Sequence, residues 1–231
     1  MRRREFTAAL SIPACLIPAY SLWAPRAAAA AVSESDAALG VRAALERGAL
    51  AAVSVLGRAD GFLGNPLVHI PLPGFLHDVA RLLRATGQGR KVDELVTAMN
   101  RAAEAAVPMA RPLFINTVKA ISVEDALQVV RGGSTSVTDF FAGKTRAPLS
   151  AQFLPIVTQA TEKVSLAARY NAVAGRAAGL GLVKGDEANV QKYVTGKALD
   201  GLFLMIGEEE KKIRADPAKA GSAILRKVFG G

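Results

Sequence analysis

The chain has 231 residues, of which 51% are hydrophobic and 21% are charged, so it can bury a sizeable core as one domain. Its net charge of +9 favours anionic partners such as phospholipid headgroups, cell-wall polymers or nucleic acid. Cys15 is the single cysteine, which excludes an internal disulfide, and cleavage near Ala31 would leave the mature chain without a cysteine for a metal site.

The first 31 residues have the layout of a bacterial signal peptide. Arginines at positions 2 to 4 precede an uncharged stretch over residues 6–24, and alanines fill positions 27–31. Arg3, Arg4 and Phe6 resemble the twin-arginine export signal, in which two arginines precede a variable residue and an aromatic one. We therefore expect residues 1–31 to direct export to the periplasm, which leaves residues 32–231 as a single domain with a net charge of about +6.

Two alternatives for this N-terminal segment stay open. The uncharged run approaches the length of a membrane span, but Pro13, Pro18 and the alanine-rich tail fit a cleaved peptide better. The stretch Ile12 to Cys15 also resembles a lipobox, at which a lipoprotein is cut and acylated on its cysteine. Proline stands where a small or aliphatic residue is usual, so lipoprotein anchoring through Cys15 is disfavoured.

The predicted elements are all helices, because no strand alternation and no hairpin signal appears in the chain. Residues 33–56 form the first helix, capped by Ser33 or Ser35 and ended at Gly57. The dense glycines and prolines from Gly57 to Gly74 predict an ordered loop. Further helices are predicted over residues 75–86, 90–106, 113–121, 122–132, 134–145, 148–164, 165–179, 186–214 and 218–229.

The run from Ala198 to Gly207 is the most apolar stretch after the N-terminus. Its apolar side chains are spaced by three and four along a helix, and they predict the centre of a bundle: Leu199, Leu202, Phe203 and Ile206. Residues 208–210 are three glutamates that pair with Lys212 and Arg214, which favours a solvated helix face. The predicted fold class is all-α, a single-domain bundle of roughly eight to ten helices.

Several motifs resemble one bacterial envelope family and occur in the same order. They are Gly61-Phe62-Leu63 with Asn65-Pro66, Ile70 to Pro73, Asn100 to Pro108, Ser122 to Ala126, and Tyr193-Val194 with Ala198 to Phe203. They resemble the exported family catalogued as domain of unknown function 4197, across nearly all of the chain after the signal. The resemblance implies an exported helical protein and carries over no catalytic or binding residue. Many members resemble lipoproteins, from which the poor lipobox of this chain departs.

Asp200 is the single charge inside the central apolar run. A carboxylate buried there needs a charged partner, for which the sequence offers Arg101 or Arg176. The alternatives are that Asp200 points to the one polar side of its helix or closes a structural ion pair, and these structural interpretations are favoured over a catalytic or ligand-binding role.

A second group of candidate residues lies on adjacent turns of one predicted helix. Asn100, Arg101 and Glu104 are placed to line a polar pocket together with Tyr170 and Asn171. Each of the five is also an ordinary residue for a helical bundle, so the pattern alone leaves both interpretations open.

His69 and His77 are the only histidines, and Asp78 adjoins the second. A metal site needs at least one more ligand in a suitable geometry, so the sequence favours surface or capping histidines and predicts no metal and no cofactor. No nucleophile elbow, phosphate-binding glycine loop or zinc helix motif occurs in the chain.

These features favour a non-enzymatic periplasmic protein that binds an apolar ligand between its helices, or another envelope component through its surface. One alternative is an enzyme acting on a cell-envelope substrate, with Asp200, Glu104 and Arg101 in a shared cleft. Another is a structural protein that contacts an anionic membrane peripherally through its basic surface. Export makes nucleic acid the least favoured partner.

Overall fold

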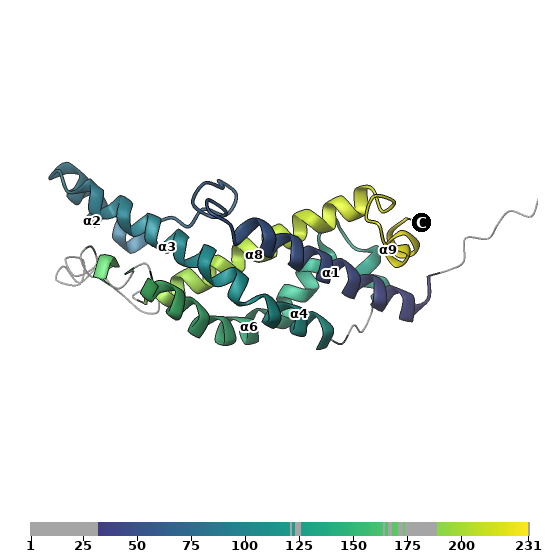
Figure 1. Cartoon of the computed structure of the whole chain (residues 1–231). Coiled ribbons are helices and arrows are strands. Elements are labelled where there is room, and N and C mark those ends of the chain that lie inside the picture. The colour runs from purple at the N-terminus through teal and green to yellow at the C-terminus, as the bar shows by residue number, and fades with distance from the viewer. Residues whose placement is uncertain are drawn as a thin grey trace, which may run out of the picture. The chain divides into compact units, whose positions relative to one another are not determined.

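The computed structural model describes residues 32–120, 122, 126–163, 165, 168–170, 173 and 189–230. These residues form an all-α, single-domain bundle, as predicted (Figure 1), and no strand occurs among them. Outside the described residues lie Arg3, Arg4, Phe6 and Cys15 of the predicted export signal, together with Asn171 and Arg176.

The described helices follow one another along the chain, and a long loop separates the first helix from η1. They are α1 (Glu34–Leu56), the 3₁₀ helix η1 (Gly74–Leu76), α2 (His77–Ala85), α3 (Gly89–Met109), α4 (Arg111–Ala120), α5 (Ala126–Arg131), α6 (Ser136–Lys163), α8 (Val190–Ala215) and α9 (Ala223–Phe229). None of these described helices combines the length and apolarity that crossing a membrane requires.

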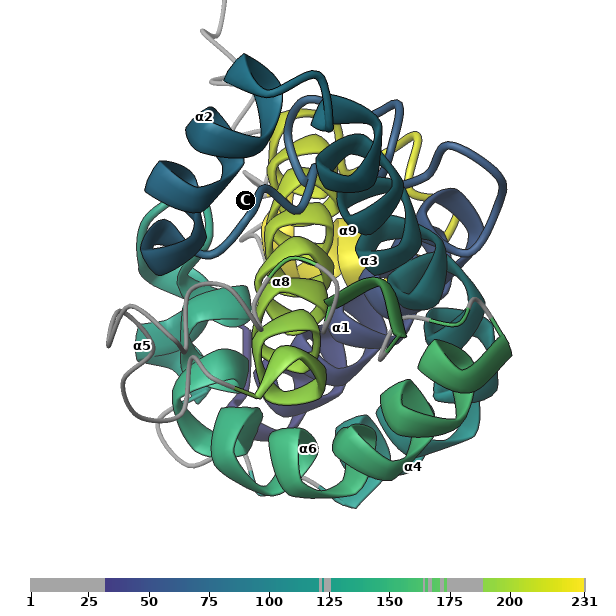
Figure 2. The ribbon, with the colours of Figure 1, turned by 90° about the vertical axis from the view of Figure 1, so that its left-hand side faces the viewer.

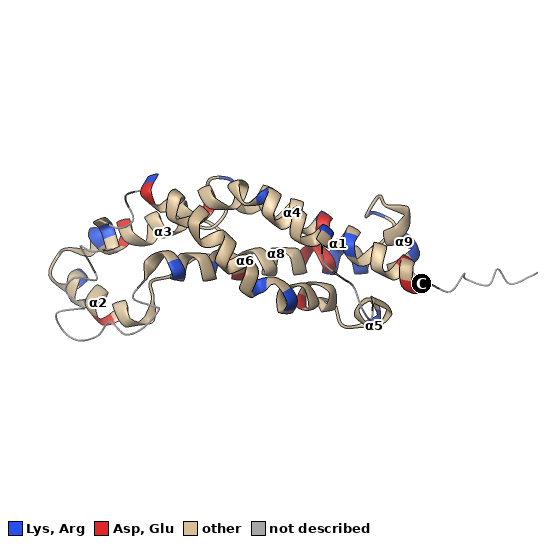
Figure 3. Ribbon diagram, turned by 90° about the horizontal axis from the view of Figure 1, so that it is seen from below, with Lys and Arg blue, Asp and Glu red and all other residues tan. Residues whose placement is uncertain are grey.

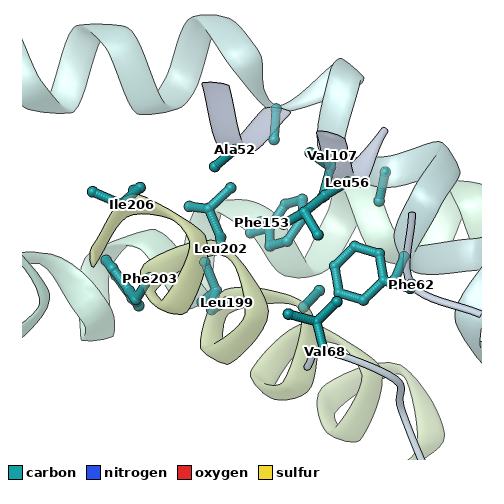
Figure 4. Close-up of a cluster of buried hydrophobic side chains, with 14 of the residues drawn as sticks. Ala52, Leu56, Phe62, Val68, Val107, Phe153, Leu199, Leu202, Phe203 and Ile206 are labelled. Carbon is teal, nitrogen blue, oxygen red and sulfur yellow. The ribbon is translucent and has the colours of Figure 1, made fainter. Parts of the chain in front are cut away.

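Helix α8 is the centre of the bundle, as its apolar run predicts. Figure 2 shows α8 nearly end-on with the other helices around it, and α1 and α6 make its most extensive contacts. The predicted stripe is buried against side chains from α1, α3 and α6 (Figure 4). Leu204, on the opposite side of α8, is 40% exposed, so the helix is not covered all round.

The first helix begins and ends where the sequence predicts. The Ser33 hydroxyl accepts a hydrogen bond from the Asp36 amide at 3.1 Å, which satisfies one of the free donors of the first turn. Gly57 follows the last helical residue, Leu56, and its amide donates to the Val53 carbonyl. Residues 57–73 then form the loop that leads to η1.

Helix α6 differs from the prediction of two helices over residues 134–145 and 148–164. It is continuous from Ser136 to Lys163 and contains both Pro148 and Pro155. Each proline removes one backbone donor, but α6 buries Leu149, Phe153 and Val157 along the bundle. Burial of these side chains against α3 and α8 stabilises α6, so the helix continues past both prolines.

Two other helix boundaries also depart from the prediction. Helix α3 continues past Ala106 through Pro108. The Pro108 ring lies against Gly57 and occupies the space that a Cβ there would need. Helix α9 begins at Ala223 rather than at residue 218. Asp216 caps a separate turn instead, since its Oδ1 accepts from the Lys219 amide at 3.2 Å, and Gly221 then takes a positive φ that favours glycine.

Candidate functional site

The Asn100 side chain on α3 holds the loop of residues 57–73 through hydrogen bonds to the loop backbone. The side-chain Oδ1 accepts from the Ile70 amide at 2.9 Å, and Nδ2 donates to the Ile70 carbonyl at 2.9 Å. Nδ2 also donates to the Val96 carbonyl within α3. The fully buried amide therefore pairs with Ile70 as a neighbouring extended strand would, and its polar atoms are satisfied inside the core.

Glu104, one turn further along α3, holds the beginning of the same loop. Its carboxylate is buried, and Oε1 accepts from the amides of Phe62 and Leu63 at 3.1 and 3.0 Å. Arg101 donates to Glu104 Oε2 at 2.6 Å and to Asp60 Oδ1 at 2.8 Å. The hydrogen bond to Glu104 raises the pKa of Arg101 above its ordinary value, against the opposing effect of burial.

The structure therefore brings together three of the sequence-predicted candidates, and it gives them a shared structural task. Asn100, Arg101 and Glu104 all contact the loop, mostly through its backbone. A buried carboxylate that accepts two amide hydrogen bonds and one from a guanidinium is fully engaged. The polar groups of Asn100 and Glu104 are thus engaged by the loop itself.

The tethered loop forms one wall of a cleft that contains both histidines of the chain. We call it the histidine cleft; it has a volume of about 560 Å³. Its loop wall carries His69, Pro71 and Leu72, and the other walls come from α2 and α3. Those walls are formed by His77, Ala80, Arg81, Arg84, Asp93, Val96 and Thr97.

Charged residues of both signs occur along α2 and at the start of α3 (Figure 3). Arg84 Nη2 contacts Asp93 Oδ1 at 3.1 Å across the cleft wall, and Arg81 Nη2 contacts Asp78 Oδ1 at 2.7 Å. All four side chains are more than half exposed, so water weakens both ion pairs. Each guanidinium has five N–H donors, which leaves others to face a ligand.

The histidines add hydrogen-bonding groups to the same cleft. His77 Nε2 lies 3.3 Å from the Leu72 carbonyl, which links α2 to the loop wall. His69 is half-buried and lines the cleft from the loop. Within the described residues, no group of three or more His, Cys, Asp or Glu side chains is placed to hold a metal ion. The chemistry available in the cleft is hydrogen bonding and charge.

Asp200 lies apart from these residues, on the side of α8 that faces α6. Its Oδ1 accepts from Arg146 Nη1 at 2.7 Å, and its Oδ2 lies 3.6 Å from Lys197 Nζ. The Asp200 side chain is 49% exposed, and the Arg146 guanidinium stacks over the Phe203 ring at 5.0 Å. The structure pairs Asp200 with Arg146 rather than with Arg101, and this contact joins α8 to α6.

Tyr170 is buried, and this burial raises the pKa of its phenol. The neighbouring Arg169 donates to Glu94 Oε2 on α3 at 2.8 Å. Both charged residues line a second groove of about 470 Å³, which Arg101 also borders. Arg101 is therefore the sequence-predicted candidate that lines this second groove.

Glu210 is a buried residue that the sequence prediction places wrongly on a solvated face. It is 2% exposed and accepts from the amides of Val137 and Thr138 at 3.0 and 2.8 Å. Arg214 donates to it at 2.9 Å and also to the Val130 carbonyl. The spacing to Arg214 predicts the ion pair, but only the fold shows that the pair caps α6.

The histidine cleft is the other feature that sequence reasoning misses. The two histidines lie on different elements, and the path of a loop rich in glycine and proline decides whether they meet. The available signal is indirect. Asn100, Arg101 and Glu104 are spaced to lie on one face of a helix, and the irregular loop of residues 57–73 needs hydrogen-bond partners from outside the loop for its backbone.

A search of curated proteins and a search of solved structures each found no match to the chain. One family model covers residues 31–230, which include every described helix and the whole histidine cleft. This match confirms the resemblance that the sequence motifs indicate. The chain belongs to the family described as Protein of unknown function (DUF4197).

Proposed function

We propose that this protein is exported to the periplasm and binds a small molecule in the histidine cleft without transforming it. The observation that carries the proposal is the tether of the loop that forms one wall of the cleft: Asn100 and Glu104 hold its backbone, and Arg101 holds the Asp60 side chain. Fixed walls lower the entropy lost when a ligand binds. The volume of about 560 Å³ is within the range of small-molecule sites.

Binding is favoured over catalysis by the way in which the candidate polar groups are used. Glu104 and Asn100 are satisfied by backbone groups inside the protein, so neither is presented to a substrate. Asp200 shares no hydrogen-bond partner with them among the described residues and is held by Arg146. Of the three residues of the enzyme alternative, Arg101 and Glu104 pair with each other, whereas Asp200 pairs with Arg146 on another helix.

Export is supported by the arginine motif and the uncharged stretch that follows it. The test replaces Arg3 and Arg4 together by lysine in the full chain and follows the protein by cell fractionation. We expect the wild type in the periplasm at a reduced mass and the double variant in the cytoplasm at full mass. Equal periplasmic amounts of both would contradict the twin-arginine route.

Ligand binding is tested by native mass spectrometry of protein purified gently from the periplasm. Thr97 is exposed and lines both the histidine cleft and the second groove, so Thr97→Trp obstructs both without disturbing the core, whereas Glu94→Trp obstructs the second groove alone. Asn116→Trp places the same ring at an exposed position of α4 as a control. We expect an added mass on the wild type, on Glu94→Trp and on Asn116→Trp that is missing from Thr97→Trp. An added mass retained by Thr97→Trp, or none on the wild type, would count against the cleft.

A further inference from the structure

We infer that the histidine cleft selects an oxyanion, carboxylate or phosphate, attached to a small apolar group. This inference rests on the proposed function and gives the ligand a chemical class. Its basis is the combination of donors and apolar surface in one cleft: guanidiniums from α2, imidazole from the loop, and aliphatic side chains between them.

The donors come from three different positions around the cleft. Arg81 and Arg84 lie one turn apart on α2, so both guanidiniums are presented by the same helix. His69 lines the same cleft from the loop, and no residue in the described part of the chain hydrogen-bonds its ring. Guanidinium and imidazole N–H groups bind oxyanions by charge-assisted hydrogen bonds, with arginine suited to two-pronged contacts.

The remaining surface of the cleft is apolar and specifies the rest of the ligand. Pro71 and Leu72 line it from the loop, Ala80 from α2 and Val96 from α3. Inorganic phosphate or a sugar phosphate would leave this apolar surface exposed to water. A phenyl-sized or short aliphatic group attached to the anion would cover it, which adds affinity in proportion to the apolar area removed from water.

Asp93 competes with a ligand oxyanion for Arg84. Its carboxylate occupies Arg84 at 3.1 Å and also lines the cleft, so a ligand oxyanion meets both the attraction of Arg84 and the repulsion of Asp93. The ion pair is exposed and therefore weak, which lets an anion share or displace it. Removal of the Asp93 charge should strengthen anion binding, whereas removal of the Arg84 charge should weaken it.

The two histidines supply the measurement, because both line the cleft and the chain has no others. The imidazole carbon-bound protons of the full chain are followed by NMR while phenyl phosphate, benzoate, benzyl alcohol, benzylamine or inorganic phosphate is added. His69→Gln assigns the two signals. We expect saturable shifts with phenyl phosphate or benzoate, weaker binding of inorganic phosphate, and no saturable shift with benzyl alcohol or benzylamine. The stronger of the two anions distinguishes a phosphate site from a carboxylate site.

Charge variants then test the arrangement of donors. We expect Arg84→Gln to weaken binding of the stronger anion by about five- to tenfold, and Asp93→Asn to strengthen it by about two- to fivefold. Arg226→Gln, which removes the same charge from exposed α9, is the matched control and should leave the affinity unchanged. Circular dichroism melting checks that each variant is folded.

The outcomes separate the inference from the proposed function. Saturable binding of benzyl alcohol or benzylamine at the histidines, with equal or greater affinity than the anions, would keep the cleft as a ligand site and overturn the anion class. Weaker anion binding by Asp93→Asn, or an equal loss with Arg226→Gln, would also overturn it. If none of the five probes shifts either histidine signal, the anion inference fails, and an added mass missing from Thr97→Trp would still support the cleft.

Discussion

Glu210 on α8 caps the beginning of α6 at Thr138, because its Oε2 accepts from both the Thr138 amide at 2.8 Å and the Thr138 hydroxyl at 2.7 Å. Glu104 on α3 binds the loop in a similar way, because its Oε1 accepts from the amides of Phe62 and Leu63. In both places an arginine of the same helix donates to the carboxylate. Two buried glutamates thus join segments that are far apart in the sequence by binding their backbone.

Replacement of Glu210 by alanine should destabilise the protein strongly. The change leaves two buried amides of α6 without acceptors and removes the carboxylate partner of Arg214, which is itself largely buried. We expect a loss of about 3 kcal/mol in the free energy of unfolding, measured by urea denaturation. Glu208→Ala is the control, since it removes an exposed pair with Lys211 and should change stability by less than about 0.5 kcal/mol. Equal losses in both variants would show that Glu210 is not a cap.

Replacement of Glu104 by alanine should loosen the loop before it unfolds the bundle. The amides of Phe62 and Leu63 lose their acceptor, and Arg101 loses its closest partner. We expect faster amide hydrogen exchange at these two residues, with helix α8 still protected, since local opening exposes the loop alone. The control Glu94→Ala, on the exposed face of α3, removes weak ion pairs and should leave loop exchange unchanged. Exchange that accelerates equally in α8 would argue against a local tether.

The sequence predicts the helical bundle and its centre because both depend on local periodicity. The stripe of α8 repeats at helical spacing, and burial follows from that pattern wherever the helix packs. The continuity of α6 escapes prediction because Pro148 carries a strong local signal to end one helix and start another. The contacts of α6 with α3 and α8 outweigh that signal, and those contacts join residues that no local window contains.

The candidate site is predictable only in part for the same reason. Helical spacing groups Asn100, Arg101 and Glu104, but their partners lie 30 to 42 positions earlier in the chain. Whether such residues bind a ligand or their own backbone depends on where the loop folds back. Asp200 shows the opposite case: its apolar neighbours in sequence suggest burial, while the helix turns it toward Arg146 and water.

Glu209 should give stability a specific dependence on acid. Burial opposes its ionisation, but hydrogen bonds from Arg47 and Lys212 outweigh this effect and hold its pKa below the ordinary value of 4.5. Because the folded state depresses the pKa, the ionised group stabilises the protein above pH 4.5, and this contribution is lost as the pH falls through the lowered pKa. Glu209→Gln should therefore be less stable than the wild type at neutral pH, with a gap that closes in acid.

The gap is measured by urea denaturation of both proteins at a series of pH values. Other carboxylates titrate in both proteins alike, so the difference isolates Glu209. Glu162→Gln, at an exposed position near the end of α6, should show no gap at any pH. A Glu209→Gln gap that stays constant into strong acid would contradict the assigned ion pair with Arg47.

Two glycines of α8 should respond to alanine with opposite signs, because one faces the loop and the other faces open space. A Cβ at Gly201 would lie 2.9 Å from Phe62 Cε1 and 3.2 Å from Val68 Cβ, in a fully packed part of the core. We expect Gly201→Ala to lower the free energy of unfolding by about 1 to 3 kcal/mol through overpacking. A Cβ at Gly196 would meet no atom of another described element within 4 Å, so Gly196→Ala should raise the free energy of unfolding by about 1 kcal/mol through helix propensity. Stabilisation by both changes would contradict close packing of Phe62 and Val68 against α8.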